Sequence, residues 1–300
     1  MEKYAVIDIG SNTIRLVVYD VQPEDRTFEI LLNEAVVAGL SSYVEDGVMS
    51  EEGIQEAQKA ISTLERRAHA IGCTRIYPFA TAAIRNCTNS RQVVDAIEEN
   101  TGLAIDVISG EEEAHLGFAG ASIGTDMESG VLVDLGGGST EITIIDDGME
   151  SHSTSIPLGC VGIYSKFVSL VFPTEDESCA INDAFASRLE ASDILRFAPR
   201  KKVYAVGGGV FSIMRMHEIL QDFDQLCESI TLEQIRSIIR LHREAPSEFA
   251  HSAVRAVPST MHMLLPACII FDTLLSRFDA DTLSLCRFGI REGYLMERIL

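Results

Sequence analysis

Short hydrophobic runs separated by small polar residues predict strands at the start of the chain. The runs cover residues 4–9, 14–19 and 28–33, and a Gly-Ser-Asn turn at residues 10–12 divides the first two. Runs of this length that end in turn-forming residues are typical of neighbouring antiparallel strands. We therefore expect the chain to open with a three-stranded meander.

After the meander, the spacing of apolar residues is typical of a helix. Residues 50–71 place apolar side chains three or four positions apart, Ser50 can cap the first turn, and Gly72 follows the last residue. Acidic residues lie early in this segment and arginines late, which suits the helix dipole. The same half of the chain is expected to add a strand at 75–80, a helix at 90–100, a strand at 104–108 and a helix capped by Ser109.

From Gly130 a similar order of elements begins again. Two strands and a glycine-rich turn occupy residues 131–146, and a third strand-like run covers 151–157. Helices are expected at about 160–171, 174–196, 210–220 and 231–243, with a strand at 202–206 and a final strand and helix at the end of the chain.

The two meanders are internal copies of each other. A shift of 126 residues, the separation of Asp8 from Asp134, also superimposes Gly10 on Gly136 and keeps the apolar runs in step. An internal repeat of this kind predicts two α/β domains of like fold that face each other. We place them at residues 1–121 and 122–288.

The amino-acid composition indicates the class of protein and the compartment in which it is expected. The chain is 46% hydrophobic and 23% charged, no apolar run reaches the length of a membrane span, and the start does not resemble a signal peptide. Seven cysteines are scattered without a CxxC pair, which favours reduced thiols in the cytoplasm. A net charge of −21 would repel nucleic acid and anionic membranes, and an anionic substrate would need local cations, helix N-termini or a metal.

The duplicated turns are candidate phosphate sites. Small residues let several backbone N–H groups point at one place, and the hydroxyls of the turns add donors. Asp8 and Asp134, which stand just before the turns, and Glu141, just after the second, suit a hydrated Mg²⁺ ion that contacts phosphate oxygens. Each turn alone would be read as an ordinary hairpin, and the paired copies favour phosphate binding.

A third glycine run links a strand to a helix. Gly207, Gly208 and Gly209 stand where a helix begins, which suits an anion or a nucleoside. Close packing of the strand against the helix explains the same glycines nearly as well.

The amino-acid sequences of several segments resemble motifs of one protein family. These are, in order, AVIDIGSNTIRLVVYD, FATAAIRN, VISGEEEAHLGF, VLVDLGGGSTEITI, YAVGGG and FGIREGYL. They are similar to the exopolyphosphatase and guanosine pentaphosphate phosphatase (Ppx/GppA) family, within the actin, hexokinase and Hsp70 superfamily of ribonuclease H-like folds. The resemblance covers essentially the whole chain, whose length is that of the short members.

The resemblance implies a role for each motif. Glu113 would be the general base, although an acidic run at a helix start would otherwise be read as serving the helix dipole. Asp134 and Glu141 would hold Mg²⁺, or Mn²⁺ in its place, with Asp8 nearby. The last helix, from residue 289, would return to the first domain, and homodimers are common in such enzymes. The terminal phosphates would be bound by Ser11, Asn12, Thr13, Gly136, Gly137, Gly138, Ser139 and Arg85.

Departures from the family keep other functions open. Gly162 and Thr260 stand where arginines are usual, and the segment 35–47 lacks an arginine. These losses remove cations that would hold a polyphosphate or a guanosine polyphosphate. The leading interpretation is a Mg²⁺-dependent phosphohydrolase acting on one or both substrates. A non-enzymatic sensor of guanosine tetra- or pentaphosphate, and an ATP-dependent kinase or ATPase of the same superfold, are the alternatives.

Overall fold

A computed structural model describes residues 2–222 and 227–300. The chain divides into two compact units, the first made of Met1–Gly120 with Ile290–Leu300 and the second of Ala121–Gly289. The limits expected from the sequence, residues 121 and 289, each lie one residue from these divisions. Each unit is described by itself below.

The first unit contains a five-stranded sheet in the order β3-β2-β1-β6-β7. The first three strands are antiparallel, as the meander predicted, and β6 and β7 continue the sheet in parallel with β1. The last strand is shorter than the expected 104–108. The strands are β1 (Glu2–Ile9), β2 (Thr13–Gln22), β3 (Thr27–Val37), β6 (Arg75–Ala80) and β7 (Asp106–Val107).

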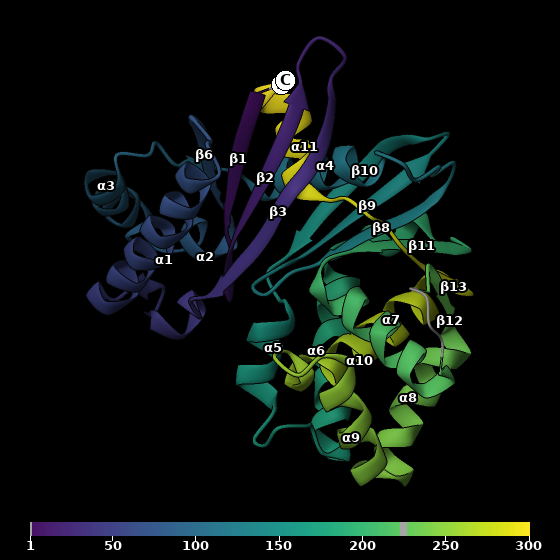
Figure 1. The fold of residues 1–300 in the computed structure, drawn as a ribbon. Coiled ribbons are helices and arrows are strands. Elements are labelled where there is room, and N and C mark those ends of the chain that lie inside the picture. The colour runs from purple at the N-terminus through teal and green to yellow at the C-terminus, as the bar shows by residue number, and fades with distance from the viewer. Residues whose placement is uncertain (1, 223–226) are drawn as a thin grey trace. The chain divides into compact units, whose positions relative to one another are not determined.

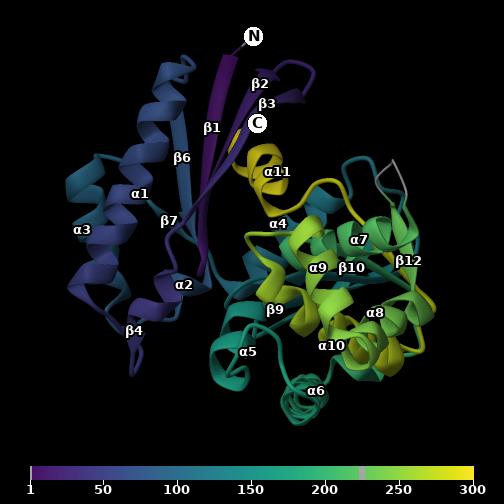
Figure 2. The ribbon, with the colours of Figure 1, turned by 60° about the horizontal axis from the view of Figure 1, so that its bottom comes forward.

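Both faces of the central strand β1 are buried, whereas β3 alternates between exposed and half-buried residues. Ile7 and Ile9 of β1 belong to one apolar cluster, and Tyr4 and Val6 belong to another. Successive side chains of a strand point to opposite faces, so the continuous apolar run of β1 fills two cores. Figures 1 and 2 show helices on both faces, with α1 and α3 on one and α4 and α11 on the other.

The helices of the first unit begin close to the predicted positions. The Ser50 side chain accepts a hydrogen bond from the Gly53 N–H and caps α1, as predicted. A side chain at Gly53 would place its Cβ 2.5 Å from the Cβ of Tyr43, so a glycine is required for space. The helices are α1 (Glu51–Ala70), α2 (Ala82–Arg85), α3 (Ser90–Thr101), α4 (Gly110–Ala121) and α11 (Ile290–Tyr294), which continues as a π-helical turn, Leu295–Ile299.

The second unit repeats the strand order of the first. Its sheet runs β10-β9-β8-β11-β13-β12, with antiparallel β8, β9 and β10 and parallel β11 and β13. Asp8 faces Arg15 across β1 and β2, and Asp134 faces Glu141 across β8 and β9, so the 126-residue shift preserves the register. The strands are β8 (Gly130–Leu135), β9 (Thr140–Asp146), β10 (Met149–Ile156), β11 (Lys202–Val206), β12 (Ser229–Thr231) and β13 (Thr282–Leu285).

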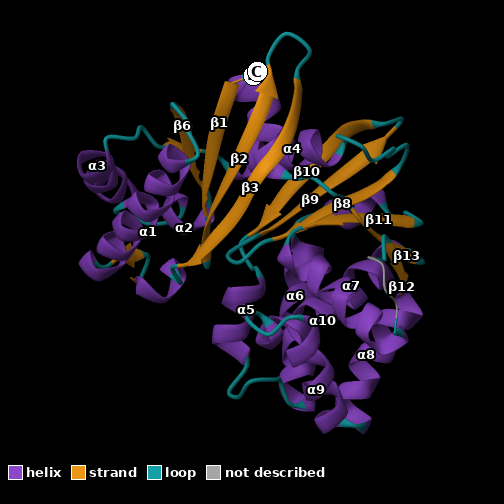
Figure 3. Cartoon of the chain, in the orientation of Figure 1, coloured by secondary structure: helices purple, strands orange, loops and turns teal. Residues whose placement is uncertain are grey.

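Six α-helices of the second unit gather on one side of its sheet (Figure 3). The expected helix over 160–171 ends at Phe167, and the one over 174–196 ends at Ala191 before a 3₁₀ turn, Ile194–Phe197. Two helices, α9 and α10, have no counterpart in the sequence prediction. The helices are α5 (Cys160–Phe167), α6 (Glu175–Ala191), α7 (Gly208–Gln221), α8 (Leu232–Glu244), α9 (Pro246–Ala256) and α10 (Met261–Phe278).

Helix α10 is the central helix of this core. It contains Pro266, which removes one helical hydrogen bond, and burial of its apolar side chains outweighs that loss. By length and composition α10 could cross a membrane, contrary to the expectation that no run is long enough. Because 67% of its apolar window is buried within the protein, we interpret it as a core helix.

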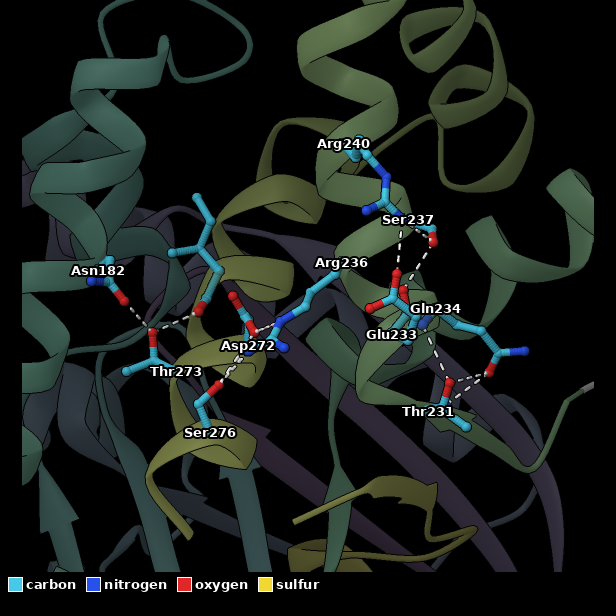
Figure 4. A network of polar contacts seen from close by, with 11 residues as sticks. Asn182, Thr231, Glu233, Gln234, Arg236, Ser237, Arg240, Asp272, Thr273 and Ser276 are labelled. Carbon is cyan, nitrogen blue, oxygen red and sulfur yellow. Dashed lines mark hydrogen bonds and ion pairs between the residues drawn. The ribbon is translucent and has the colours of Figure 1, made fainter. Parts of the chain in front are cut away.

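Polar contacts attach α10 to its neighbours on two sides (Figure 4). The Thr273 hydroxyl contacts the Asn182 side chain of α6 at 2.7 Å. Arg236 of α8 donates to Asp272 and Ser276, each at 2.8 Å. The helical layer is thus held by directed contacts as well as by apolar packing.

Candidate functional site

Glu113 lies in the first turn of α4. Ser109 and Glu112 form a reciprocal cap: the Glu112 N–H donates to the Ser109 hydroxyl at 3.1 Å, and the Ser109 N–H donates to the Glu112 carboxylate at 2.9 Å. The Ser109 N–H holds the pKa of Glu112 below its usual value. This cap sets where the helix begins, and a carboxylate in the first turn is favoured by the helix dipole.

Arg85 contacts Glu113 directly. The Arg85 guanidinium, at the end of α2, donates to the Glu113 carboxylate at 2.5 Å and to the Ile108 carbonyl at 3.2 Å. Their side chains are 17% and 11% exposed, so the pair is largely removed from water. The two residues that the sequence proposed as general base and phosphate partner thus lie in contact within the first unit.

The other two acids of the run have different surroundings. Glu111 is exposed, and Glu112 is occupied by the cap and by an ion pair with Arg298. Of the three, only Glu113 is buried. The dipole interpretation therefore suffices for Glu111 and Glu112, and Glu113 has the environment of a functional carboxylate.

Asp134 and Glu141 are direct neighbours on β8 and β9. Glu141 is 3% exposed, and the Ser155 hydroxyl donates to its carboxylate at 2.7 Å. Two carboxylates side by side repel each other, and a divalent cation would relieve that repulsion. Among the described residues no three His, Cys, Asp or Glu side chains form a metal-binding group. Mg²⁺ typically takes one or two carboxylates and completes its shell with water and phosphate oxygens, so the two neighbouring carboxylates are the residues that would hold it.

Asp8 has basic neighbours in the equivalent place. Arg15 takes the position that Glu141 has in the second copy, and the Arg291 guanidinium pairs with the Asp8 carboxylate at 2.9 Å. Burial raises the pKa of Asp8, and Arg291 opposes that shift. Sequence reasoning missed both arginines as partners. The repeat register could have pointed to Arg15, whereas Arg291 lies far along the chain.

The two turns have the same closure. The Gly10 N–H donates to the Thr13 carbonyl at 3.2 Å, and the Gly136 N–H donates to the Ser139 carbonyl at 3.0 Å. Ser11 and Ser139 are both buried. By the 126-residue shift, Ser11 corresponds to Gly137 and Asn12 to Gly138. Each turn forms a compact row of small residues within its own unit.

The third glycine run combines packing with one open position. Gly207 has a φ of +96°, and a Cβ there would lie 3.1 Å from the Asp134 carboxylate. A Cβ at Gly209 would lie 3.1 Å from Leu135, whereas one at Gly208 would meet nothing within 4 Å. Close strand–helix packing thus accounts for Gly207 and Gly209, and Gly208 alone leaves space for a ligand.

A family model supplies the identification. The model of the Ppx/GppA phosphatase family matches residues 17–300. The chain belongs to the Ppx/GppA phosphatase family. The resemblance seen in the sequence motifs is therefore confirmed.

Relatives within the Ppx/GppA family are distant. A guanosine-5'-triphosphate,3'-diphosphate pyrophosphatase of Photobacterium profundum is 27% identical over 305 residues, which cover 98% of this chain and 59% of that protein. Exopolyphosphatase 1 of Mycobacterium leprae is 20% identical over 307 residues, which cover 99% of this chain and 89% of that protein. The chain therefore spans well under two thirds of the first relative's length.

Solved Ppx/GppA structures share the fold. A structure of the Aquifex aeolicus PPX-GPPA enzyme is 25% identical, with a TM-score of 0.77 and coverage of 98% of this chain and 99% of that one. An exopolyphosphatase from Cytophaga hutchinsonii is 19% identical, with a TM-score of 0.85 and coverage of 100% and 99%. The predicted α/β fold, with two units and duplicated meanders, is confirmed and is the fold of solved Ppx/GppA structures.

The positions without the usual Ppx/GppA arginines can now be located. Gly162 lies in α5 with space beside it, since an added Cβ would approach only Leu158, at 3.9 Å. Thr260 is the residue before α10. Arg255, five residues before Thr260 in the sequence, is exposed on α9.

Proposed function

We propose that this member of the Ppx/GppA family is a Mg²⁺-dependent phosphohydrolase that releases terminal phosphate from inorganic polyphosphate, guanosine pentaphosphate or both. The observation that carries the proposal is the contact of Glu113 with Arg85 at the start of α4. Hydrolysis of a phosphoanhydride needs a proton acceptor for water and a cation for the phosphate oxygens, and this pair supplies both.

Each group would have one task. Glu113 accepts a proton from the attacking water while the water oxygen bonds to the terminal phosphorus and the bridging oxygen leaves with the shortened chain. Within the first unit, Arg85 would contact phosphate oxygens, and within the second unit the backbone N–H groups of the turn at residues 136–139 would donate to phosphate. Asp134 and Glu141 would hold Mg²⁺, which neutralises charge on those oxygens when it is bound.

Binding of substrate would also change the partner of Glu113. In the structure the Arg85 guanidinium is shared between Glu113 and the Ile108 carbonyl. A phosphate group that attracts Arg85 would weaken the ion pair between Arg85 and Glu113. Because a carboxylate paired with a guanidinium is a weaker base, this exchange would couple activation of the base to the presence of substrate.

The first test is phosphate release from long-chain polyphosphate and from guanosine pentaphosphate, with and without Mg²⁺. Glu113→Gln keeps the size and hydrogen bonding of the side chain but removes the base, so activity should fall by at least about 100-fold. Glu111→Gln is the matched control, because Glu111 is exposed, and it should retain wild-type activity. Equal activity of wild type and Glu113→Gln would remove Glu113 from the mechanism.

The missing arginines favour one second candidate, a sensor of guanosine polyphosphates without turnover. The residues at positions 162 and 260 cannot supply charge to a substrate channel. Calorimetry with guanosine tetraphosphate, in the same preparation that is assayed for phosphate release, separates the two. Submicromolar binding with no release from any substrate would assign the chain to the sensor class.

A cytoplasmic setting is part of the proposal. All seven cysteines are free in the structure, which suits a reducing compartment. Transfer of the terminal phosphoryl group of ATP to an added acceptor would support the alternative function, a kinase of the same superfold.

A further inference from the structure

The start of α5 is bonded to the glycine-rich turn of the second unit. The Cys160 N–H donates to the Gly136 carbonyl at 2.9 Å, and the Val161 N–H donates to the Gly137 carbonyl at 3.0 Å. The first amides of a helix have no partner within the helix. Here they are used on the turn, and so the helix start is not itself open to an anion.

These bonds also orient the amides of the turn. In a planar trans peptide the C=O and the next N–H point in opposite directions. Because the carbonyls of Gly136 and Gly137 point at α5, the N–H groups of Gly137 and Gly138 point away from it. Neither N–H donates a hydrogen bond within the described residues 2–222 and 227–300. Two adjacent unpaired donors of this kind form a concave anion site.

The first unit contains a similar arrangement, in which the bonded carbonyls lie one residue later than the 126-residue shift would place them. The Ser11 carbonyl accepts from the Ser41 N–H at 3.0 Å. The Asn12 carbonyl accepts from the N–H groups of Ala38 and Gly39, at 3.0 Å and 2.8 Å. In both units, the segment after the third strand of the meander (β3 or β10) donates hydrogen bonds to carbonyls of the turn between the first two strands. The internal repeat thus includes the support of each turn as well as the turn itself.

We propose that these two segments are braces, residues 159–161 in the second unit and 38–41 in the first, and that each brace orients the amides of the turn in its own unit for binding phosphate oxygens. Gly159 is the main positioning residue of the second brace. This inference rests on the proposed function, because it assigns the elements that shape the phosphate-binding turns. Hydrogen bonds in series polarise one another, so the dipole of α5 strengthens the donors of the turn through the shared peptide groups.

Gly159 is required for space and not for its backbone conformation. Its φ is −117°, an extended value that any residue adopts. A Cβ at this position would lie 2.5 Å from the Gly136 carbonyl oxygen and 2.6 Å from the Gly137 carbonyl carbon. Both contacts are with backbone atoms, so any side chain at Gly159 must displace the turn from α5.

The test measures binding of tripolyphosphate by calorimetry, in the Glu113→Gln background so that turnover does not interfere. Gly159→Ala should weaken binding by about tenfold or more, the scale of one lost hydrogen bond to a charged group. Gly162→Ala is the matched control in the same helix: its new Cβ would approach only Leu158, at 3.9 Å, and affinity should stay within about twofold. Thermal unfolding of each variant shows whether it is folded.

A second pair isolates one hydrogen bond if Gly159→Ala does not fold. Cys160→Ala removes the thiol and keeps the N–H, whereas Cys160→Pro also removes the N–H. Proline is favoured at the first helical position, so α5 should still form. Cys160→Pro should bind tripolyphosphate several-fold more weakly than Cys160→Ala, and it should unfold at a lower temperature because it loses the hydrogen bond to Gly136.

Equal binding within both pairs would overturn the brace. The outcome is independent of the reaction itself. If the wild type releases no phosphate but the variants lose tripolyphosphate binding as expected, the brace stands and the proposed activity fails. If the wild type is active and all variants bind equally, the activity stands and the brace fails.

Discussion

At the residue scale, the duplicated aspartates differ in what faces them. Asp134 has Glu141 as its cross-strand neighbour, and Asp8 has Arg15 there and Arg291 in a direct ion pair. Two carboxylates attract a cation, and a carboxylate already paired with a guanidinium does so less strongly. The repeat has kept the turn in both copies, while the charges beside it favour metal in the second copy.

The metal requirement tests this difference. Asp134→Asn removes one of two proposed oxygen ligands, so the half-saturating Mg²⁺ concentration for phosphate release should rise by about tenfold or more. Asp8→Asn should raise it by less than about twofold. It should instead lower stability by about 1–3 kcal/mol, because Arg291 loses its partner. A larger shift in Mg²⁺ requirement for Asp8→Asn than for Asp134→Asn would reverse the assignment.

At the element scale, α11 supports the helix that carries Glu113. Its Tyr294 hydroxyl donates to Asp106 at 3.0 Å, and in the turn after it Arg298 pairs with Glu112. The closest approach is at Gly293, where an added Cβ would lie 1.8 Å from the Leu116 carbonyl oxygen of α4. The backbones of α4 and α11 therefore touch, and the position of Glu113 depends on that contact.

Substitution of Gly293 should separate the two helices. Gly293→Ala is expected to destabilise the protein by about 1–3 kcal/mol, the range found when a packed core receives an extra group. Phosphate release should fall as α4 moves. Gly117→Ala in α4 is the control: its Cβ would meet nothing within 4 Å, and a helical alanine should add up to about 1 kcal/mol. Urea unfolding measures both, and equal midpoints would show that α11 does not fix α4.

At the scale of the whole molecule, the net charge of −21 opposes the approach of a polyanion. The local cation Arg85 and the proposed Mg²⁺ act only at short range, since the charge of the remaining surface is repulsive at longer distances. Salt screens that repulsion, with a Debye length that falls to about 8 Å at physiological ionic strength.

The charge predicts an unusual salt dependence. Raising NaCl from about 10 to about 150 mM, at constant free Mg²⁺, should lower KM for long-chain polyphosphate several-fold. Tripolyphosphate carries fewer charges and should respond less. If KM instead rises with salt for both substrates, attraction by local cations dominates and the global charge has no effect on binding.

Much of the fold could be predicted from local patterns. The strand at Arg75–Ala80, the Ser50 cap and the restart at Gly130 were found where the hydrophobic period and the turn residues placed them. Helices α9 and α10 were missed. In α10, Pro266 argues against a helix and the apolar run has no polar face, whereas α9 begins with Pro246, which is compatible with the first turn of a helix. Their helical state is decided by burial against other elements, which local propensity does not report.

The sequence by itself determined the duplicated turns, their order with the strands, and the acidic helix start that contains Glu113. These depend on residues within a few positions of one another, where turn geometry, capping and period act. Only the tertiary structure decided which groups are partners. Arg85 pairs with Glu113, Arg291 pairs with Asp8 across 283 positions of the chain, and the start of α5 is hydrogen-bonded to the glycine-rich turn. A contact between distant residues depends on how the chain folds back on itself, and no local pattern encodes that path.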